Sequence, residues 1–351
     1  NMKFKKKTRR KSFKKGGSGR KNNRHNRVTR NKVEGSPSGT VCNPNSRKKK
    51  VGPNTCFTPK AVDLLRNLYN MKYPDQRVRA STPREILAEI QVNSKSECKK
   101  DICLINEFAK TPRDKNVLKA LLFPPPQPKE WNDDPDAWLS NFDIIDVLRQ
   151  YEASYPHFTF IGPSPIDYNT KLSGIRCVCP RLCRFNLENW LNHIEPERGV
   201  AVTKIGIIFN LDPHHKGGSH WVSMFVDLVD NFIFYFNSTS APIPARINNL
   251  VLDIQKQGLN LKPPKKLSFH QNTLTSHQKW NSECGMYSLY FIITMLLREK
   301  EINYNSNTTP ETQKMSAHEL IDMFKGRNGY PRITDKDMFN KRKEYYSKNE
   351  T

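Results

Sequence analysis

Cys284, His220 and Asn237 are residues of this chain whose types could perform catalysis together. Cys284 stands directly before the apolar run 286–297, which predicts a buried helix that begins at the cysteine. A thiol in the first turn of a helix lies at the positive end of the helix dipole, which favours the nucleophilic thiolate. A histidine can serve as the base for such a thiol, and an asparagine can orient the histidine. The three residues therefore indicate a cysteine protease.

The runs 220–228 and 232–237 are expected to bring His220 and Asn237 to the same end of a β-sheet. Both runs are rich in β-branched and aromatic residues, and a turn within 228–231 would pair them as a hairpin. Asn237 then lies opposite a residue of 220–224, and we expect its side-chain oxygen to accept a hydrogen bond from Nδ1 of His220. In that arrangement Nε2 of His220 faces the thiol.

Gln278, six residues before Cys284, is the candidate for a further catalytic group. Its side-chain amide could donate a hydrogen bond to the oxyanion of a tetrahedral intermediate, together with the backbone N–H of Cys284. Asn281 is a weaker candidate for the same donor. Gly285 has no side chain, which lets a substrate backbone pass close to the sulfur. Each residue alone is more often structural, so the prediction depends on their combination.

The remaining patterns predict an α+β domain preceded by helices and a basic tail. Threonine–proline pairs at 58–59, 82–83 and 111–112 mark helix starts, and the proline-rich run 124–128 predicts a stiff linker. Further elements are expected as an amphipathic helix over 136–151, strands over 158–161, 204–209 and 267–270, and a helix over 243–257. We therefore divide the chain into a disordered basic tail (1–55), a helical module with its linker (56–128) and a protease domain (129–351).

Positive charge is concentrated in the first part of the chain. The 351 residues have a formal net charge of +24, and residues 1–50 alone hold 19 Lys or Arg and one acidic residue, Glu34. This run has too few apolar residues to fold by itself. It predicts contact with nucleic acid or another polyanion, a nuclear targeting signal, or a solubilising tail. Gly16-Gly17-Ser18 within it is a weaker candidate for self-cleavage.

The eight cysteines form no regular disulfide framework, so we expect them to be reduced, as in the cytosol. The spacing of Cys177, Cys179 and Cys183 fits a structural zinc site poorly, and no metal or cofactor is expected. The run 214–218, which begins with two histidines, predicts a loop that either covers the site or simply turns. No apolar run is long enough to span a membrane and no signal peptide is recognisable, so we expect no membrane insertion.

The order histidine, asparagine, cysteine resembles that of the Ulp1/adenain clan of cysteine proteases, in particular the polyprotein-processing proteases of African swine fever virus and other large DNA viruses. The similar segments are His220-Trp221-Val222, Tyr235-Phe236-Asn237-Ser238, His277-Gln278 and Glu283-Cys284-Gly285, with a weaker similarity over 332–338. The resemblance implies specific roles: His220 as general base, Asn237 as its orienting partner, Cys284 as nucleophile and Gln278 as oxyanion donor. It also implies cleavage after Gly-Gly through a narrow groove, for which Trp190, Trp280 and Phe209 are candidate walls.

The resemblance thus predicts an endopeptidase that matures viral core polyproteins at Gly-Gly-X sites during virion assembly, in the virion and the host cytoplasm. Polypeptides would be its substrates, and residues 1–50 could add contact with nucleic acid. One alternative is a deubiquitinase or deSUMOylase that acts on host conjugates. A third, less favoured hypothesis is a DNA-binding core protein with an inactive protease fold.

Overall fold

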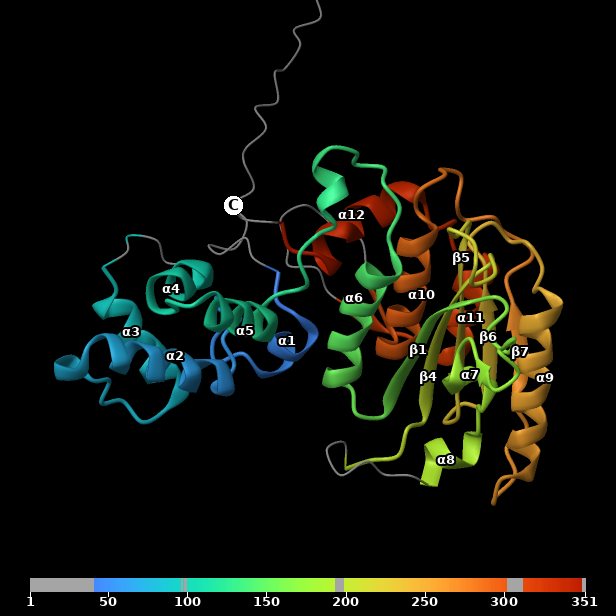
Figure 1. Cartoon of the computed structure of the whole chain (residues 1–351), viewed down its shortest axis with the longest axis horizontal. Coiled ribbons are helices and arrows are strands. Elements are labelled where there is room, and N and C mark those ends of the chain that lie inside the picture. The colour runs from blue at the N-terminus through green and yellow to red at the C-terminus, as the bar shows by residue number, and fades with distance from the viewer. Residues whose placement is uncertain (1–40, 96, 98–99, 193–198, 302–311, 349–351) are drawn as a thin grey trace, which may run out of the picture. The chain divides into compact units, whose positions relative to one another are not determined.

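The structure, a computed structural model, describes residues 41–95, 97, 100–192, 199–301 and 312–348 (Figure 1). Most of the predicted basic tail, including Gly16-Gly17-Ser18, therefore lies outside the described residues. The described part contains a five-stranded sheet in the order β1-β4-β5-β6-β7. Its strands are β1 (Phe158–Pro165), β4 (Lys204–Asn210), β5 (Trp221–Asp227), β6 (Phe232–Phe236) and β7 (Ser268–Gln271). The predicted strands and the α+β class are confirmed.

Strand direction sets which ends of the strands meet at one edge of the sheet. β1 is parallel to β4, β4 to β6 are successively antiparallel, and β7 is parallel to β6. The ends of β4 and β6 therefore lie at the same edge as the start of β5. The candidate catalytic residues His220 and Asn237, which adjoin the start of β5 and the end of β6, therefore lie at this edge.

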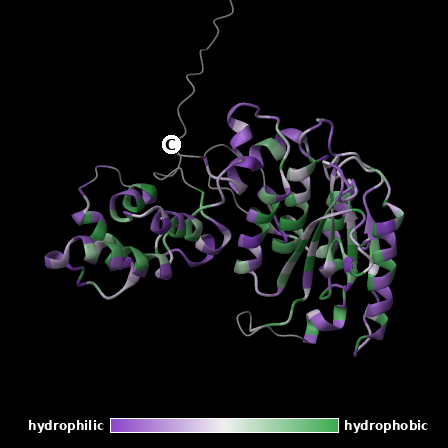
Figure 2. Cartoon of the chain, viewed as in Figure 1, coloured by the Kyte–Doolittle hydropathy of each residue, from purple (hydrophilic) through white to green (hydrophobic). Residues whose placement is uncertain are grey.

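Helices cover both faces of the sheet. One face presents Phe225 and Phe234 to α6 (Asn141–Ser154) and α10 (Cys284–Leu297). The other presents Val222 and Met224 to α9 (Ala245–Asn260). Figure 2 shows hydrophobic colouring on the strands of the sheet and on the helices that pack against it. Twelve of the fourteen residues of α10 are buried, so this helix cannot shift without disturbing the core.

Several short elements complete this domain. They are η2 (Lys129–Asn132), β2 (Lys171–Leu172), β3 (Arg176–Cys177), α7 (Pro180–Cys183), α8 (Leu187–Asn192), β8 (Glu299–Glu301), β9 (Thr312–Lys314), α11 (Ala317–Lys325) and α12 (Asp335–Tyr345). α12 contacts α10, and its Met338 and Tyr345 belong to the same core as the sheet. The sequence showed only a weak resemblance at this position.

The predicted helical module is present before the proline-rich run. Its elements are α1 (Pro44–Lys49), α2 (Pro59–Lys72), η1 (Pro74–Gln76), α3 (Pro83–Asn93), α4 (Asp101–Phe108) and α5 (Pro112–Leu122). Thr58, Thr82 and Thr111 cap α2, α3 and α5 by accepting a backbone N–H three residues later, as the threonine–proline pairs predicted. The module has an apolar core of its own.

Two predicted boundaries are wrong. The disordered tail was expected to reach residue 55, but α1 lies within it because Asn43 caps the helix and donates to the carbonyls of Ala120 and Leu121. The helix expected over 136–151 begins at Asn141, because Ser140 forms a capping box. Apolar periodicity alone does not reveal either contact.

The expectation that the cysteines are reduced is also wrong. Cys42 pairs with Cys56 and Cys177 with Cys183, and Cys103 is disulfide-bonded as well. Among the described residues the free thiols belong to Cys179 and Cys284. Pairing depends on folded proximity rather than on a regular spacing; the Cα atoms of the first pair are 5.3 Å apart across 14 residues.

Candidate active site

α10 begins at Cys284, so the thiol lies in the first turn of a buried helix, as predicted. Cys284 is only 2% exposed. The backbone N–H groups of Trp221, Gly285 and Cys284 itself lie near enough to the sulfur to lower the pKa of the thiol. The effect of Trp221 on the thiol places the sulfur near the first residue of β5, and His220 directly precedes that residue.

Antiparallel pairing of β5 with β6 brings His220 and Asn237 together. Ser223 pairs with Phe236, so the register continued by one residue sets Asn237 opposite Val222. His220 is two residues from Val222 and shares its face of the sheet, because side chains alternate along a strand. Across this diagonal, Nε2 of His220 lies 2.9 Å from Oδ1 of Asn237.

The ring nitrogen in this bond is not the expected one. The hairpin was expected to join Asn237 to Nδ1 of His220, with Nε2 left for the thiol. Diagonal neighbours across an antiparallel pair lie about 7–8 Å apart, a span that the far nitrogen Nε2 can bridge better than Nδ1. Nδ1 therefore remains as the nitrogen that can serve Cys284.

Several hydrogen bonds fix the side chain of Asn237, which is 1% exposed. Its Oδ1 also accepts from the backbone N–H and the hydroxyl of Thr239, at 3.1 and 2.8 Å. Asn272 accepts from the backbone N–H of Asn237 at 2.9 Å and donates to its carbonyl at 2.7 Å. The oxygen of the amide is thereby held toward His220. Sequence reasoning missed Asn272, which no local pattern distinguishes.

Burial sets the protonation of the cysteine and the histidine. It lowers the pKa of His220 below its ordinary value, and the bond to Asn237 opposes this only in part. It raises the pKa of the Cys284 thiol above its ordinary value, although backbone N–H groups pull it the other way. The resting site thus favours a neutral thiol beside a neutral imidazole. The sequence led us to expect a thiolate, but at the start of α10 burial raises the pKa of the thiol by more than the backbone N–H groups lower it.

Gln278 lies buried in the segment that leads into α10. Its Oε1 accepts from the hydroxyl of Ser238, and its Nε2 donates to the carbonyl of Trp280, each at 2.6 Å. An amide nitrogen carries two N–H groups, so the bond to Trp280 leaves a second one for another acceptor. Asn281, the weaker candidate for the same role, is exposed.

The segment before α6 packs directly on the nucleophile. A methyl group on Gly285 would come within 3.0 Å of Cβ of Leu139, and the carbonyl of Leu139 accepts from the indole N–H of Trp221 at 3.0 Å. Trp138, the residue before Leu139, is 46% exposed. Its side chain therefore faces solvent close to the start of α10. Sequence reasoning included it in the helix expected over 136–151 and did not single it out for the site.

The aromatic residues expected to line a groove lie in different environments. Phe209 is fully buried beneath the α9 face of the sheet, so it cannot line a groove. Trp190 is stacked by Arg181 at 5.2 Å and packs at the edge of the same core. Trp280 is 49% exposed, and its carbonyl holds Gln278. Of the three, Trp280 is thus tied to the segment before Cys284.

His214 of the 214–218 loop is anchored by a buried carboxylate. Asp167 accepts from the backbone N–H of His214 at 2.8 Å and lies 2.6 Å from its Nδ1. Asp167, His214 and His215 could offer three metal-ligand atoms within 4.8 Å of one another. Because His214 already engages both carboxylate oxygens, we assign the cluster to holding the loop. The zinc alternative at Cys177 and Cys183 is removed by their disulfide.

Known proteins share this site region and fold. Residues 187–350 match the Ulp1 protease family, C-terminal catalytic domain. A protein of Acanthamoeba polyphaga mimivirus named as a thiol protease is 34% identical over 171 residues, which are 49% of this chain and 52% of that protein. A protein of African swine fever virus named SUMO-1 cysteine protease is 27% identical over 191 residues, 51% of this chain and 66% of that protein. The chain thus spans about half to two thirds of the length of these relatives.

The fold is similar to the crystal structure of the African swine fever virus protease. The TM-score is 0.53 at 21% identity, over 88% of this chain and 96% of that one. This similarity confirms the predicted fold, and the family match agrees with the predicted cysteine-peptidase class. Within the described residues, none of the helices combines the length and apolarity needed to cross a bilayer.

Proposed function

Because residues 187–350 match the Ulp1 protease family, we propose that this chain is a cysteine endopeptidase with Cys284 as its nucleophile. His220 acts as the general base, and Asn237 orients it. The observation that supports this assignment best is the convergence at the start of β5. There the backbone N–H of Trp221 lies near enough to the sulfur to lower the pKa of the thiol, and the preceding residue, His220, binds Asn237 at 2.9 Å.

The first step is transfer of the thiol proton of Cys284 to Nδ1 of His220. Nε2–H of the ring donates to Asn237 before and after this transfer, so the ring keeps its orientation. The thiolate then attacks the carbonyl carbon of the scissile peptide bond. The imidazolium gives its proton to the leaving amine as that bond breaks, which leaves an acyl group on the sulfur. The neutral ring next activates a water molecule, which releases the acid and regenerates the thiol.

The negative charge of the tetrahedral intermediate needs donors that are already in place. We assign this role to the backbone N–H of Cys284 and the second N–H of Gln278. Loss of one such donor costs about 10²–10³-fold in kcat in other hydrolases. The bonds of Gln278 to Ser238 and Trp280 support the assignment, because they hold the amide rigid before substrate arrives.

Crowding around Gly285 supports a preference for Gly-Gly. Leu139 lies against Gly285, the indole N–H of Trp221 donates to the carbonyl of Leu139, and Trp138 directly precedes Leu139 in the chain. A substrate chain that passes the sulfur between such groups has little room for side chains. Glycine meets this limit and also tolerates a wide range of backbone angles. Trp138 thus takes the wall role that was expected of Trp190 and Phe209.

The substrates that we propose are Gly-Gly-X sites in viral core polyproteins, cleaved during virion assembly in the virion and host cytoplasm. The relatives named as thiol proteases come from two viruses, which favours this choice. The name SUMO-1 cysteine protease favours the alternative, a deSUMOylase or deubiquitinase acting on host conjugates. Nucleic-acid contact through residues 1–50 would follow from their 19 Lys or Arg, and deletion of that run should then abolish salt-sensitive DNA binding.

One competition experiment tests the proposed function. The purified chain and its Cys284→Ala variant are incubated with Gly-Gly-X peptides, Ala-Ala-X peptides, and precursors of ubiquitin and SUMO. We expect cleavage after Gly-Gly in the peptides, none after Ala-Ala, and no product from the variant. Cleavage of the modifier precursors alone would select the alternative. Absence of any product from the unmodified chain would overturn the proposal.

A further inference from the structure

Helix α12 packs against α10, the helix that begins at Cys284. Two of its residues, Asp335 and Arg342, are only 3% and 6% exposed. They are seven residues apart, which is two helical turns, so both project from the same face of α12. Neither residue takes part in the reaction as described above.

Asp335 holds the beginning of the segment that leads to the nucleophile. Its two carboxylate oxygens lie 3.1 and 3.0 Å from the backbone nitrogen of Lys279, which donates to them. Lys279 directly follows Gln278. The hydroxyl of Tyr287, on α10, lies 3.4 Å from the same carboxylate and also donates to the carbonyl of His277 at 3.1 Å.

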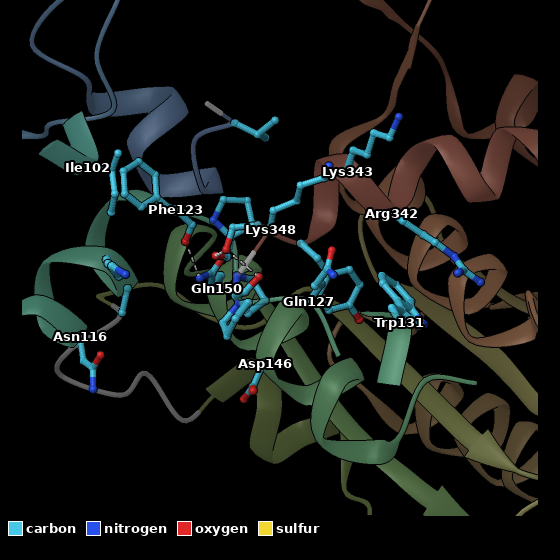
Figure 3. A pocket seen from close by; sticks show the side chains of 18 of the residues that line it. Ile102, Asn116, Phe123, Gln127, Trp131, Asp146, Gln150, Arg342, Lys343 and Lys348 are labelled. Carbon is cyan, nitrogen blue, oxygen red and sulfur yellow. Dashed lines mark hydrogen bonds between the residues drawn. The ribbon is translucent and has the colours of Figure 1, made fainter. Parts of the chain in front are cut away.

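Arg342 holds the end of the same segment. Its guanidinium forms a buried ion pair with Glu283, the residue before Cys284, and donates to the carbonyl of Pro135. Glu283 is fully buried and occupies the N-cap position of α10. Figure 3 shows Arg342 beside Trp131 in the wall of a cavity of about 1000 Å³, and the guanidinium lies 4.3 Å from the centre of that ring.

We propose that Asp335 and Arg342 are positioning residues, which fix the two ends of the segment 278–284 so that its donors meet the oxyanion. The segment before Cys284 has neither helix nor strand structure, so side-chain contacts decide where its N–H groups point. A misplacement of about 1 Å in such a site can cost about 10²-fold in rate. The inference rests on the proposed peptidase function, since it concerns the same oxyanion.

A purely structural ion pair predicts a different result from a positioning pair. Alkylation of Cys284 by iodoacetamide needs the thiolate but no oxyanion donor, whereas peptide hydrolysis needs both. Loss of positioning should therefore slow hydrolysis and leave alkylation unchanged. Loss of folding should change the rates of both reactions and also lower the melting temperature.

The test compares variants for kcat, KM, the rate of Cys284 alkylation read by mass spectrometry, and the melting temperature. Arg342→Met alone would leave the carboxylate of Glu283 buried without a partner. The double variant Arg342→Met with Glu283→Gln avoids that charge. Asp335→Asn perturbs the other end of the segment. Lys343→Met removes an exposed charge from the neighbouring position of α12 and serves as the matched control.

We expect the double variant and Asp335→Asn to lose about 10- to 100-fold in kcat, with KM within about threefold of the unmodified chain. The alkylation rate should stay within about threefold in Asp335→Asn and should not fall in the double variant, since loss of the Glu283 charge lowers the pKa of the thiol. Arg342→Lys should recover part of the loss, and Lys343→Met should change nothing. Unchanged kcat in the folded double variant, or equal losses in hydrolysis and alkylation, would overturn the inference. If the unmodified chain alkylates at Cys284 but hydrolyses no Gly-Gly peptide, the proposed function fails, and the inference fails with it.

Discussion

Replacement of Asn237 by aspartate should convert the resting site from a neutral pair into an ion pair. In the unmodified site, burial lowers the pKa of His220 and raises that of Cys284, so both groups are mostly neutral at pH 7. Oδ1 of Asn237 lies 2.9 Å from Nε2 of His220, which would place a carboxylate charge about 4 Å from the charge of an imidazolium. The donors from Thr239 would remain satisfied, because a carboxylate accepts as an amide oxygen does.

The size of the effect follows from this distance. Two unit charges at about 4 Å interact by about 4 kcal/mol at an effective dielectric constant of ~20, which corresponds to ~3 pKa units. Because His220 is only half-buried, we discount this to ~1–2 units for solvent screening. The added carboxylate raises the pKa of His220, so more of the ring is imidazolium at a given pH. Next to an imidazolium, the thiol of Cys284 ionises at lower pH.

The assay is the rate of Cys284 alkylation by iodoacetamide as a function of pH. For the unmodified chain we expect a rate that rises with pH up to and above pH 9. For Asn237→Asp we expect about a tenfold or larger increase at pH 7, from the ~1–2 unit shift. On the acid side of its pH profile, the rate of hydrolysis should fall only below pH 6.5 in the unmodified chain. In the variant this fall should occur at a higher pH, since the base must be neutral to accept a proton.

Asn237→Ala is the control, because it removes the acceptor without adding a charge. It should leave the alkylation profile in place and reduce hydrolysis, since the ring of His220 loses its orientation. A plateau of alkylation between pH 6 and 8 in the unmodified chain would show an ion pair already formed. That result, or an unchanged profile in Asn237→Asp, would refute the reasoning from burial.

Three further substitutions test separate parts of the structure. Gln278→Ala should lower kcat by about 10²–10³-fold with little change in KM, and an equal fall in alkylation of the thiol would contradict an oxyanion role. Gly206→Ala in β4 would bring a methyl group to 2.8 Å from Cγ2 of Ile292 on α10, and should destabilise the fold by about 1–3 kcal/mol in urea unfolding; an unchanged midpoint would contradict this packing. Phe291→Ala removes a fully buried ring stacked 4.8 Å from that of Phe236, and should cost about 3–5 kcal/mol in the same assay, with a loss below 1 kcal/mol as the contrary result.

Features that depend on neighbouring residues in the chain were predictable from the sequence. The apolar run after Cys284 predicted a helix that begins at this residue, because a fully buried helix needs apolar side chains on every face. The threonine–proline pairs predicted the starts of α2, α3 and α5, because capping is a contact over three residues. The hairpin of β5 and β6 followed from two apolar runs separated by a short turn, and it brought His220 to Asn237.

Features that depend on distant parts of the chain were decided by the tertiary structure. Which ring nitrogen of His220 meets Asn237 depends on the diagonal across two strands, and sequence spacing does not specify it. The raised pKa of Cys284 depends on how completely the sheet and the helices cover the sulfur, which opposes the local effect of the helix dipole. The contacts of Asp335 and Arg342 with the segment before Cys284 span more than fifty residues.

The sequence by itself thus determined which groups could do chemistry and where the nucleophile stands in its helix. The tertiary structure decided how those groups are protonated, oriented and supported. The physical reason is that residue type and periodicity act over a few residues. Burial, electrostatic fields and buried ion pairs arise only when segments far apart in the chain pack together.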